Sequence, residues 1–91
     1  MSEKKYTVEF SPSSSKYLKK LNKVTQNLLF KKIEDLQDNP LPNGVKKLSA
    51  SIGFYRIRVL DYRIIYSLNN SRLEILVIKI GHRSDVYKRL E

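Results

Sequence analysis

The first half of the chain has a short strand-like pattern followed by two helix-like patterns of apolar positions. Residues 6–10 alternate as a strand does, and Ser11 and Pro12 then offer an N-cap and a proline at the first helical position. Apolar residues recur at helical spacing to about Leu21, and a second helix follows a break near residues 22–25. The apolar stripe of the second helix consists of Leu29, Ile33 and Leu36. The pattern predicts a strand followed by a helical hairpin.

The second half has the period-two pattern of strands, after a loop that begins in the turn-rich residues 39–44 and carries two lysines. Residues 54–59 form one expected strand, with Tyr55, Ile57 and Val59 on one face and Phe54, Arg56 and Arg58 on the other. Residues 62–68 form the next strand after a tight turn. Residues 73–80 are apolar at nearly every position, which indicates a central strand covered on both faces and ended by Gly81.

These elements predict one α+β domain that spans residues 1–91. We expect the N-terminal strand and the helical hairpin to pack on a mostly antiparallel sheet of three to four strands. A loop after Gly81 and a short C-terminal helix complete the expected fold.

The charge of the chain narrows the classes of partner. Eighteen Lys and Arg residues oppose nine Asp and Glu residues, for a net charge of +9, which favours a polyanion such as nucleic acid or an acidic protein. No apolar run is long enough to span a bilayer and no secretory signal is evident, so we expect a cytoplasmic protein that does not bind membranes. With no cysteine, and with His82 as the single histidine, we expect no metal site and no cofactor.

All six arginines lie after residue 55, whereas the first half of the chain uses only lysine. A guanidinium group can donate two parallel hydrogen bonds to a phosphate, which an ammonium group cannot. Two adjacent strands would carry Arg56, Arg58 and Arg63, and the end of a third would deliver His82 and Arg83 to the same side. Because such a cluster repels itself unless an anion neutralises it, the sequence predicts an anion-binding site there. A generic solvated basic surface is the alternative.

Three segments together resemble the RelE toxins of the RelE/ParE superfamily. They are FSPSSSKYLKKL at residues 10–21, YRIRVLDYRIIY at residues 55–66 and IGHRSDVY at residues 80–87. Their order and spacing cover essentially the whole chain. The resemblance implies the toxin of a type II toxin–antitoxin system, a metal-independent, ribosome-dependent endoribonuclease, or mRNA interferase, that cuts mRNA in the ribosomal A site and inhibits translation. It also implies a RelB-like antitoxin as partner, with operator DNA bound only through the toxin–antitoxin complex.

The resemblance implies a role for each matching residue in 2′-hydroxyl attack on the adjacent phosphate. Arg63 and Arg83 would clamp the scissile phosphate, and Arg56 and Arg58 would hold the transition state or a flanking phosphate. Tyr87 would stack on a base or move a proton, and the general base stays open between Tyr87 and His82, which stands where some members have lysine. The expected contacts to RNA or to the ribosome are Lys46, Lys47 and Phe54.

Two other functions fit the same basic surface. A ParE-like toxin would share the fold but inhibit DNA gyrase and lack nuclease activity. A non-catalytic module would bind nucleic acid or antitoxin without turnover, and its affinity for nucleic acid would fall steeply with salt.

Overall fold

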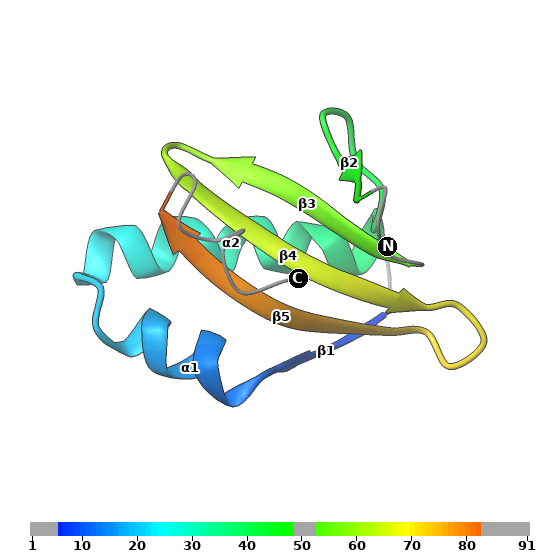
Figure 1. Ribbon diagram of the computed structural model, residues 1–91, viewed down its shortest axis with the longest axis horizontal. Helices are drawn as coiled ribbons and strands as arrows, with labels where there is room; N and C mark the ends of the chain where they lie inside the picture. The colour runs from blue at the N-terminus through cyan, green and yellow to red at the C-terminus, as the bar shows by residue number, and fades with distance from the viewer. Residues whose placement is uncertain (1–5, 49–52, 83–91) are drawn as a thin grey trace.

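In a computed structural model, residues 6–48 and 53–82 are described, and they form a five-stranded mixed sheet with two helices (Figure 1). The strand order is β1-β5-β4-β3-β2; β1 runs parallel to β5, and the other neighbours are antiparallel. The elements are β1 (Thr7–Phe10), α1 (Pro12–Lys19), α2 (Lys23–Asp38), β2 (Lys46–Lys47), β3 (Phe54–Val59), β4 (Tyr62–Asn69) and β5 (Glu74–His82).

The predicted α+β fold is confirmed, with three differences in the sheet. The structure adds β2, which was predicted as loop, because two consecutive lysines carry no alternation and only their pairing with β3 makes them a strand. The strand β5 continues through Gly81 to His82 instead of ending at Ile80. β5 lies inside the sheet, as expected. The prediction that both of its faces are covered is wrong at Leu76, which is 40% exposed. The expected C-terminal helix lies outside the described residues.

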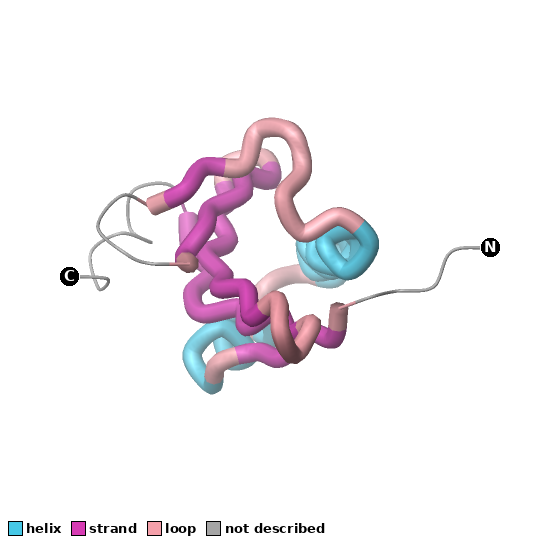
Figure 2. The backbone as a smooth tube through the Cα atoms, turned by 90° about the vertical axis from the view of Figure 1, so that its right-hand side faces the viewer, coloured by secondary structure: helices cyan, strands magenta, loops and turns pink. Residues whose placement is uncertain are grey.

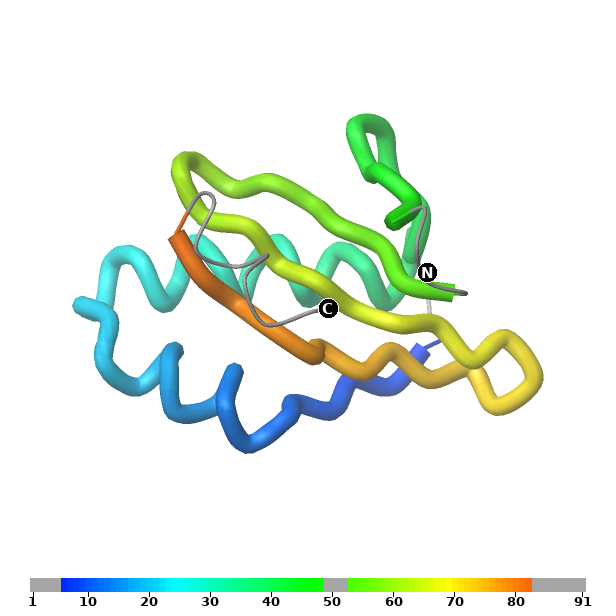
Figure 3. The backbone as a smooth tube through the Cα atoms, viewed as in Figure 1, coloured from blue at the N-terminus to red at the C-terminus, as the bar shows by residue number. Residues whose placement is uncertain are grey.

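The start of α1 is tied to β5 by two serine hydroxyl groups. Ser11 is the N-cap, as predicted: its Oγ accepts a hydrogen bond from the backbone N–H of Ser14 and donates to the carbonyl of Ile78 at 2.7 Å. Ser14 is buried and its Oγ donates to the carbonyl of Val77 at 3.0 Å. Ile78 has no partner in β4, because the register between β4 and β5 shifts there. The hydroxyl groups therefore bind β5 where β1 ends and α1 begins, and α1 runs on beside β5 (Figure 3).

We expect Ser14→Ala to lower the free energy of unfolding by about 0.5–1.5 kcal/mol, because it removes a buried hydrogen bond to the carbonyl of Val77, which keeps the backbone N–H of Ser11 as its other donor. Urea denaturation followed by circular dichroism measures the change. Ser13→Ala, one residue earlier on the exposed side of the same turn, is the matched control and should stay within about 0.5 kcal/mol of the wild type. Equal stability of the two variants would show that the hydroxyl of Ser14 does not hold the junction.

The helix α2 lies apart from the sheet and faces one side of it (Figure 2). The hydrophobic core fills the space between them and also includes Leu18 of α1. Leu29 and Leu36 of α2 are fully buried against the alternate residues of the central strands. The sheet contributes Ile57, Ile64, Tyr66, Ile75, Val77 and Ile80. The hydroxyl of Tyr66 donates to the carbonyl of Pro40 at 2.6 Å, and burial, with a smaller contribution from Tyr55, raises the pKa of this phenol well above its ordinary value. Tyr66 is therefore a neutral structural residue, and functional side chains must be sought on the opposite face.

No helix in residues 6–48 or 53–82 is long and apolar enough to cross a membrane.

Candidate functional site

The two-residue turn at Leu60 and Asp61 sets the positions of the arginines. It pairs Val59 with Tyr62 and therefore places Arg58 directly opposite Arg63. Leu60 has a φ of 56°, in the left-handed region that a β-carbon disfavours, so the turn is held by the strand pairing on either side of it. Any change in the length of this turn would shift the register and separate the two guanidinium groups.

Arg56, Arg58 and Arg63 lie on the face of the sheet opposite α2. This follows from alternation, because their neighbours Ile57 and Ile64 are buried in the core between α2 and the sheet. Directly opposite residues in an antiparallel pair have Cα atoms about 4.5–5.5 Å apart, so Arg58 and Arg63 begin within easy reach of one ligand. The structure thus brings together the three strand arginines that the sequence pattern placed on one face.

The environment of Arg58 and Arg63 is unfavourable without an anion. Like charges directly opposite each other in a sheet are destabilising, and neither residue pairs with a carboxylate among the residues that the structure describes. The Nε and Nη1 atoms of Arg63 are buried and have no hydrogen-bond partner there. A buried charged donor without a partner carries a desolvation penalty, and the oxygens of a bound phosphate would remove it.

A further cation, Lys79 of β5, belongs to this face. It lies opposite Ile65, which in turn lies opposite Arg56, so the three residues form one row across the sheet. Ile65 is fully buried although it is not part of the core against α2, and in the register of the sheet it lies between the two cationic residues. The sequence analysis missed Lys79, because the extra residue Ile78 breaks the alternation that would have revealed it.

His82 does not join the arginines. In β5 it lies two residues after Ile80, which faces the core, whereas the intervening Gly81 is the residue opposite Arg63. The ring of His82 contacts Tyr62 edge to face, with 5.2 Å between centroids, and its Nε2 is 3.9 Å from Oδ2 of Asp61. His82 therefore belongs to an aromatic group at the end of the sheet. The other two expected site residues, Arg83 and Tyr87, lie outside the described residues.

The three expected RNA or ribosome contacts occupy different places. Lys46 lies opposite Arg56, so it shares the arginine face, whereas Lys47 lies opposite Tyr55 and belongs to the other face at the sheet edge. Phe54 is on the arginine face, opposite Ser67, at the end of β3 remote from Arg58. Of the three, Lys46 is the residue that extends the cationic surface next to Arg56.

A recess of about 310 Å³ opens beside β3 at its outer edge. Its lining combines the loop before β2, one side chain of α2 and the edge of β3: Lys32, Asn43, Gly44, Lys46, Arg56, Ile57 and Arg58. Lys32 lies outside the apolar stripe of α2, so the helical pattern alone does not place it near the arginines. Only the packing of α2 against β3 brings it to the arginines.

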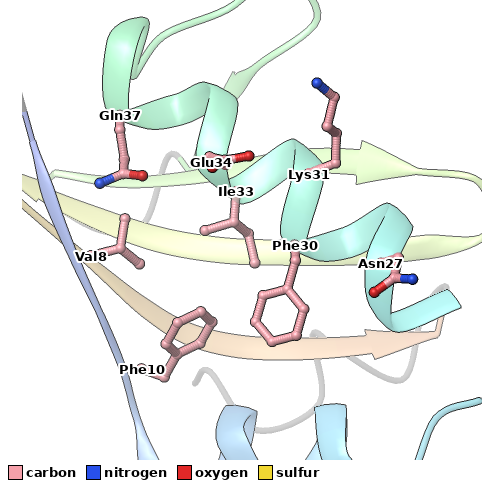
Figure 4. A pocket seen from close by; sticks show the side chains of 8 residues that line it. All are labelled: Val8, Phe10, Asn27, Phe30, Lys31, Ile33, Glu34 and Gln37. Atoms are coloured by element: carbon pink, nitrogen blue, oxygen red, sulfur yellow. The ribbon is translucent and has the colours of Figure 1, made fainter. Parts of the chain in front are cut away.

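A larger hollow of about 410 Å³ lies between β1 and α2 (Figure 4). Phe10 and Phe30 belong to its lining and meet edge to face, with 6.0 Å between ring centroids. Lys31 and Glu34 of α2 give its rim one charge of each sign. This hollow suits an apolar side chain and, unlike the recess at β3, offers no excess of positive charge to a phosphate.

Comparisons with known proteins agree over nearly the whole chain. The family model described as "ParE toxin of type II toxin-antitoxin system, parDE" matches residues 8–87. A putative RelE-like toxin protein of Escherichia coli is 34% identical over 88 residues, covering 91% of this chain and 90% of that protein. Toxin RelG of Mycobacterium tuberculosis is 26% identical over 88 residues, covering 92% and 98%. A chain of the archaeal RelE-RelB complex from Pyrococcus horikoshii is 30% identical, with a TM-score of 0.78, over 88% of this chain and 97% of that one.

Proposed function

Because the chain belongs to the RelE/ParE superfamily, as a RelE-type toxin of a type II toxin–antitoxin system, we propose that it is a metal-independent endoribonuclease that cuts mRNA in the ribosomal A site. Inhibition of translation in the cytoplasm follows from that activity. The observation that carries the proposal is the pairing of Arg58 with Arg63, whose buried Nε and Nη1 have no partner among the described residues. A bound phosphate would supply the partners that these groups lack.

The reaction requires charge stabilisation more than it requires a strong nucleophile. The 2′-hydroxyl of mRNA loses a proton to a general base and attacks the adjacent phosphorus, and the bond to the 5′-oxygen breaks as that oxygen gains a proton. The pentavalent transition state carries additional negative charge, which positioned cations stabilise. Arg63 and Arg83 hold the scissile phosphate, and Arg56 and Arg58 contribute charge from β3. Guanidinium groups thus supply the positive charge that a metal ion supplies in other nucleases.

The position of His82 bears on the choice of general base. His82 contacts Tyr62 and lies on the core face of β5, whereas the arginines lie on the other face of the sheet. This position argues against proton transfer by His82 at a phosphate that the arginines hold. Tyr87 is then the candidate to stack on a base or to move the proton. A site with few acid–base groups fits an enzyme whose substrate is oriented by the ribosome, because orientation supplies a large part of the barrier reduction.

The test is cleavage of a defined mRNA on programmed 70S ribosomes, mapped by primer extension. We expect cuts confined to the A-site codon and no cuts in the same RNA without ribosomes. Naked RNA cut equally well would contradict the dependence on the ribosome. A folded protein that cuts neither RNA would refute the nuclease.

Inhibition of DNA gyrase is the second candidate, because the matching family model carries the ParE description. The arginine cluster of β3 and β4 favours the nuclease, since cleavage of mRNA requires groups that hold a phosphate. A supercoiling assay with purified gyrase separates the two functions. We expect no inhibition at protein concentrations that cut mRNA on ribosomes.

A RelB-like antitoxin is the proposed protein partner, as in the RelE-RelB complex of the Pyrococcus horikoshii relative. The net charge of +9 suits an acidic or amphipathic segment that orders as it binds. Operator DNA would then be bound only by the toxin–antitoxin complex.

A further inference from the structure

The recess at the outer edge of β3 has the composition of an anion site. Lys32 of α2, Lys46 of β2, and Arg56 and Arg58 of β3 line this recess of about 310 Å³, and its described lining residues include no carboxylate. Within residues 6–48 and 53–82, Lys32, Lys46 and Arg58 form no ion pair. The Asn43 side chain adds a neutral amide that can donate a hydrogen bond. Four cations, and no anionic side chain, therefore line the recess among the residues that the structure describes.

The short length of β2 is the reason that the recess exists. β2 pairs with β3 only at Arg56 and Tyr55, so among the described strands none covers the outer edge of β3 from Ile57 to Val59. The buried side chain of Ile57 contributes to the lining, and the rim carries the cations. At about 30 Å³ for each water molecule of the liquid, the volume of about 310 Å³ has room for a phosphodiester and part of a sugar.

Arg58 connects this recess to the proposed cleavage site. It lines the recess and also lies directly opposite Arg63. Arg56 and Arg58 are two residues apart in one strand, or about 7 Å, which is comparable to the separation of neighbouring phosphates in an extended RNA strand. A strand whose scissile phosphate is held by Arg58 and Arg63 would therefore bring an adjacent phosphate to the recess.

We propose that the recess formed by Lys32, Asn43, Lys46 and Arg56 binds the phosphate next to the scissile one and so sets the register of the mRNA. This inference rests on the proposed nuclease function. Lys32 and Lys46 are positioning residues: they fix which phosphate reaches Arg63 and take no part in the chemical step.

Binding to uncuttable mRNA tests this proposal separately from cleavage. The probe is a 70S ribosome programmed with mRNA whose A-site codon carries 2′-O-methyl groups, and the affinity of fluorescently labelled protein is measured by titration. Two further mRNAs replace either the 5′ or the 3′ neighbour of the scissile phosphate with a neutral methylphosphonate. We expect one of these replacements to weaken wild-type binding about tenfold, because it removes the anion that the recess holds.

The double variant Lys32→Gln with Lys46→Gln should bind the all-phosphate mRNA about tenfold more weakly and should no longer distinguish it from that methylphosphonate mRNA. The matched control, Lys16→Gln with Lys23→Gln, removes two exposed helical lysines outside the recess and should keep the distinction. If the double variant lost the same factor of affinity for all three mRNAs, the two lysines would contribute only non-specific electrostatic attraction, and the proposal would be overturned. The proposal would also be overturned if a glutamate-rich peptide displaced the wild type, but not the double variant, from the ribosome. That result would indicate that the recess binds an acidic protein.

Cleavage of unmodified mRNA is measured in parallel. Cleavage by the wild type without any phosphate-specific effect would remove the recess and leave the nuclease standing. A phosphate-specific effect without cleavage would support phosphate binding in the recess and refute the nuclease function. Failure of the protein to bind programmed ribosomes would refute both the nuclease function and the role of the recess.

Discussion

Replacing Arg63 with alanine should lower the rate of mRNA cleavage on programmed ribosomes by at least about 100-fold. Arg63 is opposite Arg58 in the register of β3 and β4, and its Nε and Nη1 atoms are buried without a partner in the described part of the chain. A phosphate at this position would give these donors partners, and its negative charge grows in the transition state. Single-turnover cleavage with saturating enzyme measures the effect on the chemical step.

The same substitution should leave the fold intact and should not lower its stability. It removes a buried charged donor without a partner and a like charge opposite Arg58, both of which disfavour the folded state. Urea denaturation should therefore show a free energy of unfolding equal to or above that of the wild type. Arg72→Ala is the matched control, because Arg72 is exposed and pairs with Glu74 at 3.6 Å away from the cluster. Wild-type cleavage by Arg63→Ala, or an equal loss in both variants, would refute the phosphate clamp.

The sequence was most informative where one periodicity governs a whole element. The predicted and observed bounds of β3 coincide at residues 54–59, because its alternation is unbroken and one face is buried. The cap at Ser11 and the stripe of Leu29, Ile33 and Leu36 were also predicted correctly, since capping and helical spacing are local properties. The common face of Arg56, Arg58 and Arg63 followed from the strand pattern and the short turn alone.

The remaining features depend on packing that no local pattern encodes. β2 exists only because Lys46 and Lys47 meet β3, and the recess exists only because α2 brings Lys32 to the same place. The extra residue Ile78 hid Lys79 in a run of apolar residues. The expectation that His82 gathers with the arginines was wrong, because β5 continues two residues further and places His82 on the opposite face.

Ile64 is the neighbour of Arg63 in β4, and its replacement by alanine should have the opposite consequence. The side chain of Ile64 is fully buried in the core between α2 and the sheet. Loss of a buried isoleucine side chain removes about 2–5 kcal/mol through lost burial and the cavity left behind. Because a small domain has a total stability of about 5–15 kcal/mol, Ile64→Ala should leave a substantial unfolded fraction under mild denaturing conditions.

Cleavage by Ile64→Ala should fall only in proportion to the folded fraction, because Ile64 points away from the phosphate. Urea denaturation and single-turnover cleavage of the same samples separate the two quantities, and a dose of urea that unfolds half of the variant should halve its activity. Val24→Ala, at a position 72% exposed on α2, is the control for loss of an apolar side chain and should change neither. Two results would contradict these roles: a stable but inactive Ile64→Ala, or an unstable Arg63→Ala that is active per folded molecule. Either result would show that the core face of β4 does not serve mainly stability, or that its arginine face does not serve mainly catalysis.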